Sequence, residues 1–277
     1  MSASPTISFI GAGNMASAII GGMLASGYKA ASIWASAPDE EQLQSIQKKF
    51  GINTTADNHR CVQQADVVVL AVKPQVMRDV CRDIAPVVQS GQPLMASIAA
   101  GLTTETLDKW LGGNTALVRV MPNTPSLVGK GAAGLFANAR VQDDQKNVVE
   151  SVFNSIGSAL WVDDENLLHG VTALSGSGPA YFFLMLEALE EAATKTGLPA
   201  GTARQLAIQT MAGAAEMAAR SEYDPARLKR NVMSPGGTTE QAINAFEEGG
   251  LRDLVSRAYN AAFKRSEEMA KELADKQ

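Results

Sequence analysis

A glycine-rich turn near the start of the chain carries the clearest chemical signal. The apolar run Ile7–Ile10 leads directly into Gly11-Ala12-Gly13-Asn14-Met15-Ala16, and a helical pattern follows. In such a strand-turn-helix, Gly11 permits the tight turn, Gly13 lets the backbone approach a pyrophosphate, and Ala16 allows close helix-strand packing. The free N–H groups and positive dipole end of the helix favour phosphate. We therefore predict that a dinucleotide contacts Ile10, Gly11, Ala12, Gly13, Asn14 and Met15.

The end of the second strand bears on which dinucleotide is bound. Sites selective for NAD place Asp or Glu there, about 20 residues after the glycine motif, to accept the ribose hydroxyls. Here the strand Ser32–Ala35 ends in Ser36-Ala37-Pro38, without a carboxylate or an arginine. A carboxylate would repel a 2′-phosphate, whereas Ser36 and backbone N–H groups can bond it, so the sequence favours NADPH over NADH. Asn58 or His59 is the candidate to complete this pocket.

Two further strand ends are candidates to line the ribose and the nicotinamide. In open parallel sheets, ligands bind outside the carboxyl ends of the strands. The strands Val67–Val72 and Leu94–Ile98 end in loops at that edge, and Lys73 is either a ribose contact or a solvated charge. The residues concerned are Ala71, Val72, Lys73, Pro74, Ile98, Ala99 and Ala100.

A second glycine-rich signal lies in the other half of the chain. The runs Ser175–Tyr181 and Ser234–Glu240 both precede long helical patterns. The second run combines small residues with a threonine pair, so it offers backbone N–H groups and hydroxyl donors to a small carboxylate. Taken alone, it is equally well explained as a capped helix start.

The elements that must position these residues alternate in the first half of the chain. Predicted strands are Ile7–Ile10, Ser32–Ala35, Val67–Val72, Leu94–Ile98 and Leu117–Met121. Predicted helices between them are Met15–Ala25, Glu40–Phe50, Cys61–Ala65, Val76–Val88 and Thr104–Leu111. A hairpin-like stretch at Gly131–Ala137, a helix at Asp143–Ser155 and a strand at Ala159–Val162 close this half. The alternation predicts an α/β Rossmann domain over residues 1–162, a doubly wound parallel sheet with helices on both faces.

The strand signal ends after Asp163, and the remaining sequence is rich in Ala, Glu, Leu and Met. Its helical patterns are Pro179–Thr196, Thr202–Ser221, Thr239–Glu248 and Leu251–Asp275. We therefore predict an all-α domain over residues 163–277. Several of these helices are apolar on more than one side, as at Met211–Ala215, and such a helix needs neighbours all round. The sequence thus predicts a homodimer or larger assembly through this domain.

Composition excludes several classes of partner. The 24 basic and 29 acidic residues give a formal net charge of -5, spread in mixed clusters, with no basic footprint for nucleic acid or an anionic membrane. Cys61 and Cys81 lie outside any motif of metal-ligand spacing, so we expect reduced thiols and no metal site. No charged leader is visible, and no stretch approaches the roughly 18 apolar residues of a membrane helix. We expect a cytoplasmic protein.

Five motifs, in order along nearly the whole chain, carry a family resemblance. They are Phe9–Met15, Ala71–Pro74, Met121–Pro125, Ser175–Tyr181 and Val232–Thr239. The chain thereby resembles the pyrroline-5-carboxylate reductases, which complete proline synthesis. The resemblance implies reduction of the C=N bond of 1-pyrroline-5-carboxylate to L-proline, with hydride from NADPH and more weakly from NADH.

The resemblance also implies roles for single residues. It places the dinucleotide among Ile10–Met15, Ser36, Ala37, Asn58, Ala71–Pro74 and Ile98–Ala100, with Asn231 reaching it from the helical domain. It places the pyrroline ring among Glu165, Ser234, Gly237, Thr238 and Thr239, with the substrate carboxylate on the backbone of the helix start. The family forms dimers, sometimes stacked into a ring, and completes each site across the dimer interface. At Ala37 the family often has a second serine, a departure that affects only the strength of 2′-phosphate binding.

The implied chemistry needs no acid on the protein. Hydride delivered to a carbonyl leaves an alkoxide that must be protonated, whereas hydride delivered to a protonated imine leaves a neutral amine. The related β-hydroxyacid dehydrogenases carry a lysine on the helix after the glycine-rich substrate loop, and that position here is Phe182. We expect catalysis by proximity and orientation, with Thr239 hydrogen-bonded to the ring nitrogen. A reductase of another cyclic imino acid and a non-catalytic nucleotide sensor stay open as alternatives.

Overall fold

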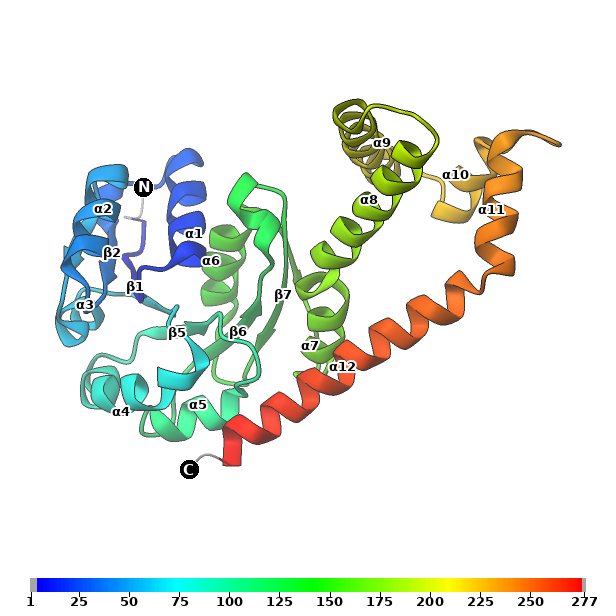
Figure 1. The fold of residues 1–277 in the computed structure, drawn as a ribbon. Coiled ribbons are helices and arrows are strands. Elements are labelled where there is room, and N and C mark those ends of the chain that lie inside the picture. Colours follow the sequence, from blue (N-terminus) through cyan, green and yellow to red (C-terminus); the bar gives the residue numbers. More distant parts are fainter. Residues whose placement is uncertain (1–3, 276–277) are drawn as a thin grey trace. The chain divides into compact units, whose positions relative to one another are not determined.

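Figure 1 shows the fold in a computed structural model that describes residues 4–275. Within these residues eight strands form one sheet, in the order β3-β2-β1-β4-β5-β6-β7-β8. Their bounds are β1 Ile7–Ile10, β2 Ile33–Ser36, β3 Asn53–Thr55, β4 Val67–Leu70, β5 Leu94–Ser97, β6 Leu117–Met121, β7 Gly131–Ala137 and β8 Gly157–Trp161. Neighbouring strands are parallel except β6 and β7. The order of the first six is that of a Rossmann sheet, which confirms the predicted fold class.

Helices cover both faces of the sheet (Figure 1). One core contains α1 (Asn14–Ala25), α2 (Glu40–Phe50) and α6 (Asp143–Asn154), and the other contains α3 (Asn58–Gln63), α4 (Pro74–Gly91) and α5 (Thr104–Trp110). Successive strand residues alternate between the cores: Phe9 lies in the first and Ile10 in the second. Burial on both sides explains why the strands are continuous apolar runs. Cys61 and Cys81 are buried in the second core as free thiols.

Local sequence sets several helix boundaries. Asp39 caps α2 by accepting two backbone N–H bonds, and Gly51 ends the helix with φ 67°. The observed bounds of α2 match the predicted ones. The helix α3 begins at Asn58, earlier than the predicted Cys61, because Asp57 supplies a cap. Strand β3 lies at the sheet edge and is only half-buried, so no apolar run marked it.

The stretch predicted to be hairpin-like is a single strand, β7. A 3-10 turn, η2 (Thr124–Val128), connects it to β6, with which it pairs antiparallel. On its other side β7 pairs parallel with β8, which begins at Gly157 opposite Gly131. A Cβ on Gly157 would overlap the backbone of Gly131, so the close approach of these strands requires glycine there.

Beyond β8, the described chain forms helices and turns without a further strand. The helices are α7 Leu167–Val171, α8 Gly178–Lys195, α9 Ala200–Arg220, α10 Pro225–Asn231, α11 Thr238–Glu248 and α12 Leu251–Asp275, with a π-helical turn at Thr172–Gly176 before α8. The chain divides into two compact units. Residues up to Ser177 and those from Ala262 onward form the first unit, and Gly178–Ala261 form the second. Helix α12 therefore contributes to both, and a functional boundary between residues 162 and 163 stays a prediction.

A buried polar pair anchors the end of α12 in the first unit. His169 Nδ1 lies 2.9 Å from Ser266 Oγ, and both side chains are buried. Burial lowers the pKa of His169, and the nearby Arg119 also lowers it, so the surroundings favour the neutral imidazole. A neutral hydrogen bond therefore joins α7 to α12. Further along α12, Leu273 packs beneath Gly101.

Candidate functional site

The turn between β1 and α1 has the geometry that a pyrophosphate requires. Gly11 has φ +105°, and its N–H donates to the carbonyl oxygen of Ser36 at 2.9 Å. A Cβ on Gly11 would lie 2.8 Å from the carbonyl carbon of Ala71. Gly13 is the N-cap of α1, and a Cβ there would meet nothing within 4 Å. The first N–H groups of a helix lack partners inside it, so the open space beside Gly13 suits an anion.

Three loops meet at the carboxyl edge of the sheet. Ile10 and Leu70 end neighbouring strands in register. The N–H of Ala71 donates to the carbonyl of Ile10 at 2.8 Å, and the N–H of Ile98 donates to that of Leu70 at 3.2 Å. Lys73, the N-cap of α4, has an exposed side chain. The structure thus brings together three of the predicted segments, Ile10–Met15, Ala71–Pro74 and Ile98–Ala100.

The last residue of β2 makes a contact that the sequence did not indicate. Ser36 is fully buried, and its Oγ donates to Oδ1 of Asn58 at 2.7 Å. The hydroxyl proton of Ser36 is therefore engaged, and the Nδ2 group of Asn58 is the amide donor of this pair. Ala37 is also buried. His59, the other sequence candidate, lies 3.2 Å from Oδ1 of Asp83. Asn58, rather than His59, is the side chain that Ser36 orients.

The predicted substrate residues of the second unit gather at the start of α11. Thr238 and Thr239 are its first two residues, so their N–H groups have no acceptor within the helix. Gly237 is the N-cap, and its N–H closes the preceding turn on the carbonyl of Ser234 at 2.8 Å. Asn231, predicted to reach the dinucleotide, ends α10 with an exposed side chain.

Glu165 is the predicted substrate residue that lies in the first unit. Its carboxylate accepts from the N–H of Thr104 at 2.6 Å, from Thr104 Oγ1 at 2.8 Å and from Arg119 Nη1 at 2.8 Å. Neither Thr104 nor Arg119 was among the residues predicted for the site. The available signal was an arginine inside the apolar run Leu117–Met121, because a buried cation requires an anionic partner.

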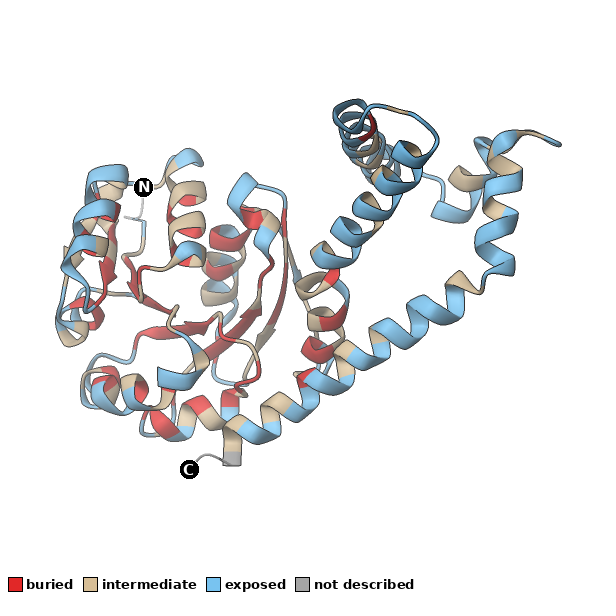
Figure 2. Ribbon diagram, in the orientation of Figure 1, coloured by how far each residue is buried: buried red, intermediate tan, exposed pale blue. Residues whose placement is uncertain are grey.

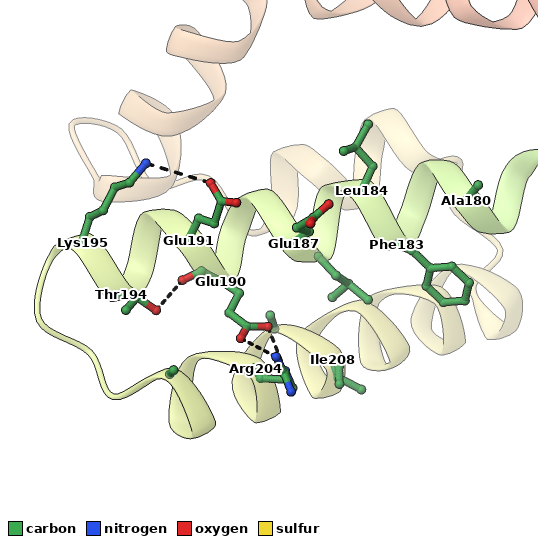
Figure 3. A pocket seen from close by; sticks show the side chains of 13 residues that line it. Ala180, Phe183, Leu184, Glu187, Glu190, Glu191, Thr194, Lys195, Arg204 and Ile208 are labelled. Atoms are coloured by element: carbon green, nitrogen blue, oxygen red, sulfur yellow. Dashed lines mark hydrogen bonds and ion pairs between the residues drawn. The ribbon is translucent and has the colours of Figure 1, made fainter.

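A groove of about 990 Å³ lies between α8 and α9 in the second unit (Figure 3). Phe183, Leu184 and Ile208 line it, and Arg204 donates two hydrogen bonds of 2.9 Å to Glu190. Phe183 is 65% exposed and Leu184 is 66% exposed. Figure 2 shows that most of α8 and α9 is likewise exposed. Large apolar side chains gathered at such exposure are typical of an interaction surface.

Between residues 4 and 275, no helix has the length and apolar character to cross a membrane. In the same part of the chain, no three His, Cys, Asp or Glu side chains are grouped so that they could hold a metal ion.

Two protein-family models match the chain. Residues 6–101 match the model described as NADP oxidoreductase, coenzyme F420-dependent, and residues 165–269 match that of pyrroline-5-carboxylate reductase dimerisation. The pyrroline-5-carboxylate reductase of Pseudomonas aeruginosa is 50% identical over 97% of this chain and 98% of its own. A solved pyrroline-5-carboxylate reductase from Coxiella burnetii is 46% identical, with a TM-score of 0.94 over 97% of this chain and 99% of its own. The Plasmodium falciparum pyrroline carboxylate reductase, solved with NADP bound, is 32% identical, with a TM-score of 0.84 over 96% and 98%.

The Rossmann sheet, its glycine-rich turn and the open space at Gly13 define an oxidoreductase with a pyridine nucleotide cofactor. The helical unit that follows is of the kind that joins such chains into oligomers. The chain belongs to the pyrroline-5-carboxylate reductase family. The match to the dimerisation model also supports homo-oligomerisation.

Proposed function

We propose that this protein uses NADPH to reduce the C=N bond of 1-pyrroline-5-carboxylate to L-proline, the last step of proline biosynthesis. The observation that carries the proposal is the start of α11, where Thr238 and Thr239 offer N–H and hydroxyl groups within the segment matched by the family's dimerisation model. Relatives named for this reaction, similar along their whole length, support the same substrate. When bound, NADPH would supply the hydride, and Ile98–Ala100 would hold its nicotinamide end.

The groups at this helix start suit a small cyclic imino acid. The N–H groups at the positive end of α11 favour the substrate carboxylate, and Ser234 and Gly237 shape the turn that receives it. The hydroxyl of Thr239 is proposed to hydrogen-bond the ring nitrogen and so to align the C=N carbon. Because hydride addition to a protonated imine leaves a neutral amine, the protein contributes proximity and orientation rather than an acid.

Replacing Thr239 with alanine tests the role of its hydroxyl. We expect kcat/KM for the imine to fall by about 1–3 kcal/mol, roughly five- to 150-fold, because one buried hydrogen bond is lost. The matched control is Thr239→Ser, which keeps the hydroxyl and is expected to retain most of the activity. Steady-state kinetics with the imine varied at saturating NADPH would measure both. An unchanged kcat/KM in Thr239→Ala would remove this residue from the mechanism.

The preference for NADPH is proposed to rest on the pair of Ser36 and Asn58. Ser36 holds Oδ1 of Asn58, so that Nδ2 and the backbone N–H groups near Ala37 receive the 2′-phosphate. The substitution Asn58→Asp keeps the acceptor for Ser36 and replaces the donor with a negative charge. We expect the NADPH-to-NADH ratio of kcat/KM to fall roughly ten- to hundredfold, as for loss of a hydrogen bond to a charged group. An equal loss with both cofactors would contradict this assignment.

The substrate itself is tested by comparing cyclic imines. NADPH absorbance would be followed with 1-pyrroline-5-carboxylate, pyrroline-2-carboxylate and piperideine-2-carboxylate under the same conditions. We expect the fastest oxidation with the first. Oxidation with the six-membered ring alone would replace the proposed substrate, and no oxidation with any of the three would favour a nucleotide sensor.

We also propose that the helical part of the chain forms a homodimer, with a higher oligomer such as a ring of dimers as the alternative. The exposed apolar faces of α8 and α9 support an assembly of this kind. Residues 1–162 are proposed to act as the dinucleotide-binding domain and residues 163–277 as the substrate and dimerisation domain. The cytoplasm is the proposed location. Sedimentation velocity at several protein concentrations would distinguish the dimer from the ring.

A further inference from the structure

The carboxylate of Glu165 holds the first residue of α5. It accepts both the N–H and the hydroxyl of Thr104, at 2.6 and 2.8 Å, across 61 positions of sequence. Thr104 opens the helix, so its N–H has no acceptor inside α5. The side chain of Thr103, the N-cap, accepts the N–H of Thr106 at 3.1 Å. The N–H of Thr104 is therefore available to bind Glu165. Glu165 therefore completes the cap of a helix to which it does not belong.

Arg119 fixes the position of this carboxylate. Its side chain is 7% exposed, and Nη1 lies 2.8 Å from Oε1 of Glu165. Removing either side chain would leave the charge of the other one poorly hydrated and without a counter-charge, which is costly. The ion pair therefore keeps both side chains in place. Arg119 also stands beside Ser97 in the β5–β6 register. The ion pair therefore lies beside the end of β5, where the loop of residues 98–103 begins.

The loop between β5 and α5, residues 98–103, is therefore fixed at both of its ends and also packs against α12. Its first residue, Ile98, donates its N–H to the carbonyl of Leu70 at 3.2 Å, and the loop ends where Glu165 caps α5. In between, Gly101 has φ +78°, and a Cβ there would lie 3.0 Å from Cδ1 of Leu273 on α12. All of these residues belong to the first unit. Few conformations remain open to the backbone of residues 98–103.

We propose that Glu165, together with Arg119, is a positioning residue that shapes the 98–103 loop for the nicotinamide end of the cofactor. It acts through Thr104 and not by contact with the imine, because both of its oxygens are engaged by protein donors. This refines the role near the pyrroline ring that the family resemblance implied. The inference rests on the proposed function only in placing the nicotinamide beside Ile98–Ala100.

The test uses Thr104→Val, with Thr104→Ser as the matched control. Valine keeps the shape and the backbone N–H but removes the hydroxyl that binds Glu165, whereas serine keeps it. In the full-length protein without ligand, we expect amide hydrogen exchange over residues 98–104 to rise about three- to tenfold in Thr104→Val. NADPH binding, followed by its fluorescence without any imine, should weaken by a similar factor. Thr104→Ser should match the parent in both measurements.

A second variant separates positioning from substrate contact. Glu165→Gln keeps one acceptor oxygen, for the N–H of Thr104, and removes the charge that Arg119 requires. We therefore expect it to weaken NADPH binding and to leave the KM of the imine within about twofold. A raised imine KM with unchanged NADPH binding and unchanged exchange would show that Glu165 touches substrate and would overturn the inference. A lower melting temperature in Thr104→Val without a local change in exchange would also overturn it. Neither exchange nor NADPH binding involves the imine, so a wrong substrate assignment would leave both results intact.

Discussion

The variant Gly13→Ala is expected to lose NADPH binding while keeping the stability of the parent protein. Gly13 has φ -75°, which alanine adopts readily, and a methyl group there would meet no atom within 4 Å. The same methyl would occupy the open space proposed for the pyrophosphate, whose approach to the backbone requires glycine. We expect the Kd for NADPH to rise roughly ten- to hundredfold, the effect of a close steric contact, with a melting temperature within about two degrees.

The matched comparison is Gly11→Ala, which should lose both NADPH binding and stability. Its φ of +105° is strained for alanine, and its Cβ would lie 2.8 Å from the carbonyl of Ala71. We expect the free energy of unfolding to fall by about 1–3 kcal/mol as the turn shifts. Fluorescence titration and thermal denaturation would be run on both variants. Tight NADPH binding by Gly13→Ala would place the pyrophosphate elsewhere.

The variant Leu184→Glu is expected to separate the subunits and to lose most of the activity. Leu184 is 66% exposed on α8 and lines the groove between α8 and α9 (Figure 3), so a carboxylate there is solvated in an isolated chain. In an assembly that covers this face, the same carboxylate would be buried without a partner. Size-exclusion chromatography at micromolar concentration should show a monomer. The family resemblance implies that each site is completed across the dimer, so we expect kcat/KM to fall at least roughly tenfold.

The control for this variant is Leu160→Glu on β8 of the first unit. Leu160 is 68% exposed, so the chemical change and the exposure are closely matched. We expect this variant to keep the oligomeric state and the activity of the parent. If Leu184→Glu remains an active oligomer, the face of α8 around Leu184 lies outside the interface.

The sequence predicted elements well wherever a local signal sets their limits. Helix α12 spans the predicted Leu251–Asp275, and β1 spans the predicted Ile7–Ile10. Both have an unbroken pattern, and glycine stands at one boundary of each: Gly250 precedes α12 and Gly11 follows β1. The sequence pattern did not predict the edge strand Asn53–Thr55, because its three polar, half-buried residues show no alternation of apolar and polar side chains. The fold class followed from the order of elements and needed no exact boundary.

What the sequence determined by itself is the class of protein, and it also indicated the segments proposed to contact the cofactor. The motif Gly11–Ala16 is contiguous, and its meaning depends on a strand and a helix that its own neighbours specify. The parallel order of the sheet then brings the other loops to the same edge.

Only the tertiary structure decided how the polar side chains of the site are used. Ser36 donates to Asn58, which lies 22 positions away, and Glu165 joins Arg119 and Thr104, which lie 46 and 61 positions away. Local propensity does not encode such partners. Many pairs of polar residues could come into contact when the sheet and its helices pack, and neighbouring residues in the sequence do not specify which pairs do. Ser36 and Arg119 are buried by the packing of the fold. A buried polar or charged group is costly unless it is hydrogen-bonded or paired, so each of them requires a partner. The polar contacts around the proposed site were therefore visible only after folding, whereas the glycines proposed to accommodate the cofactor were evident in the sequence.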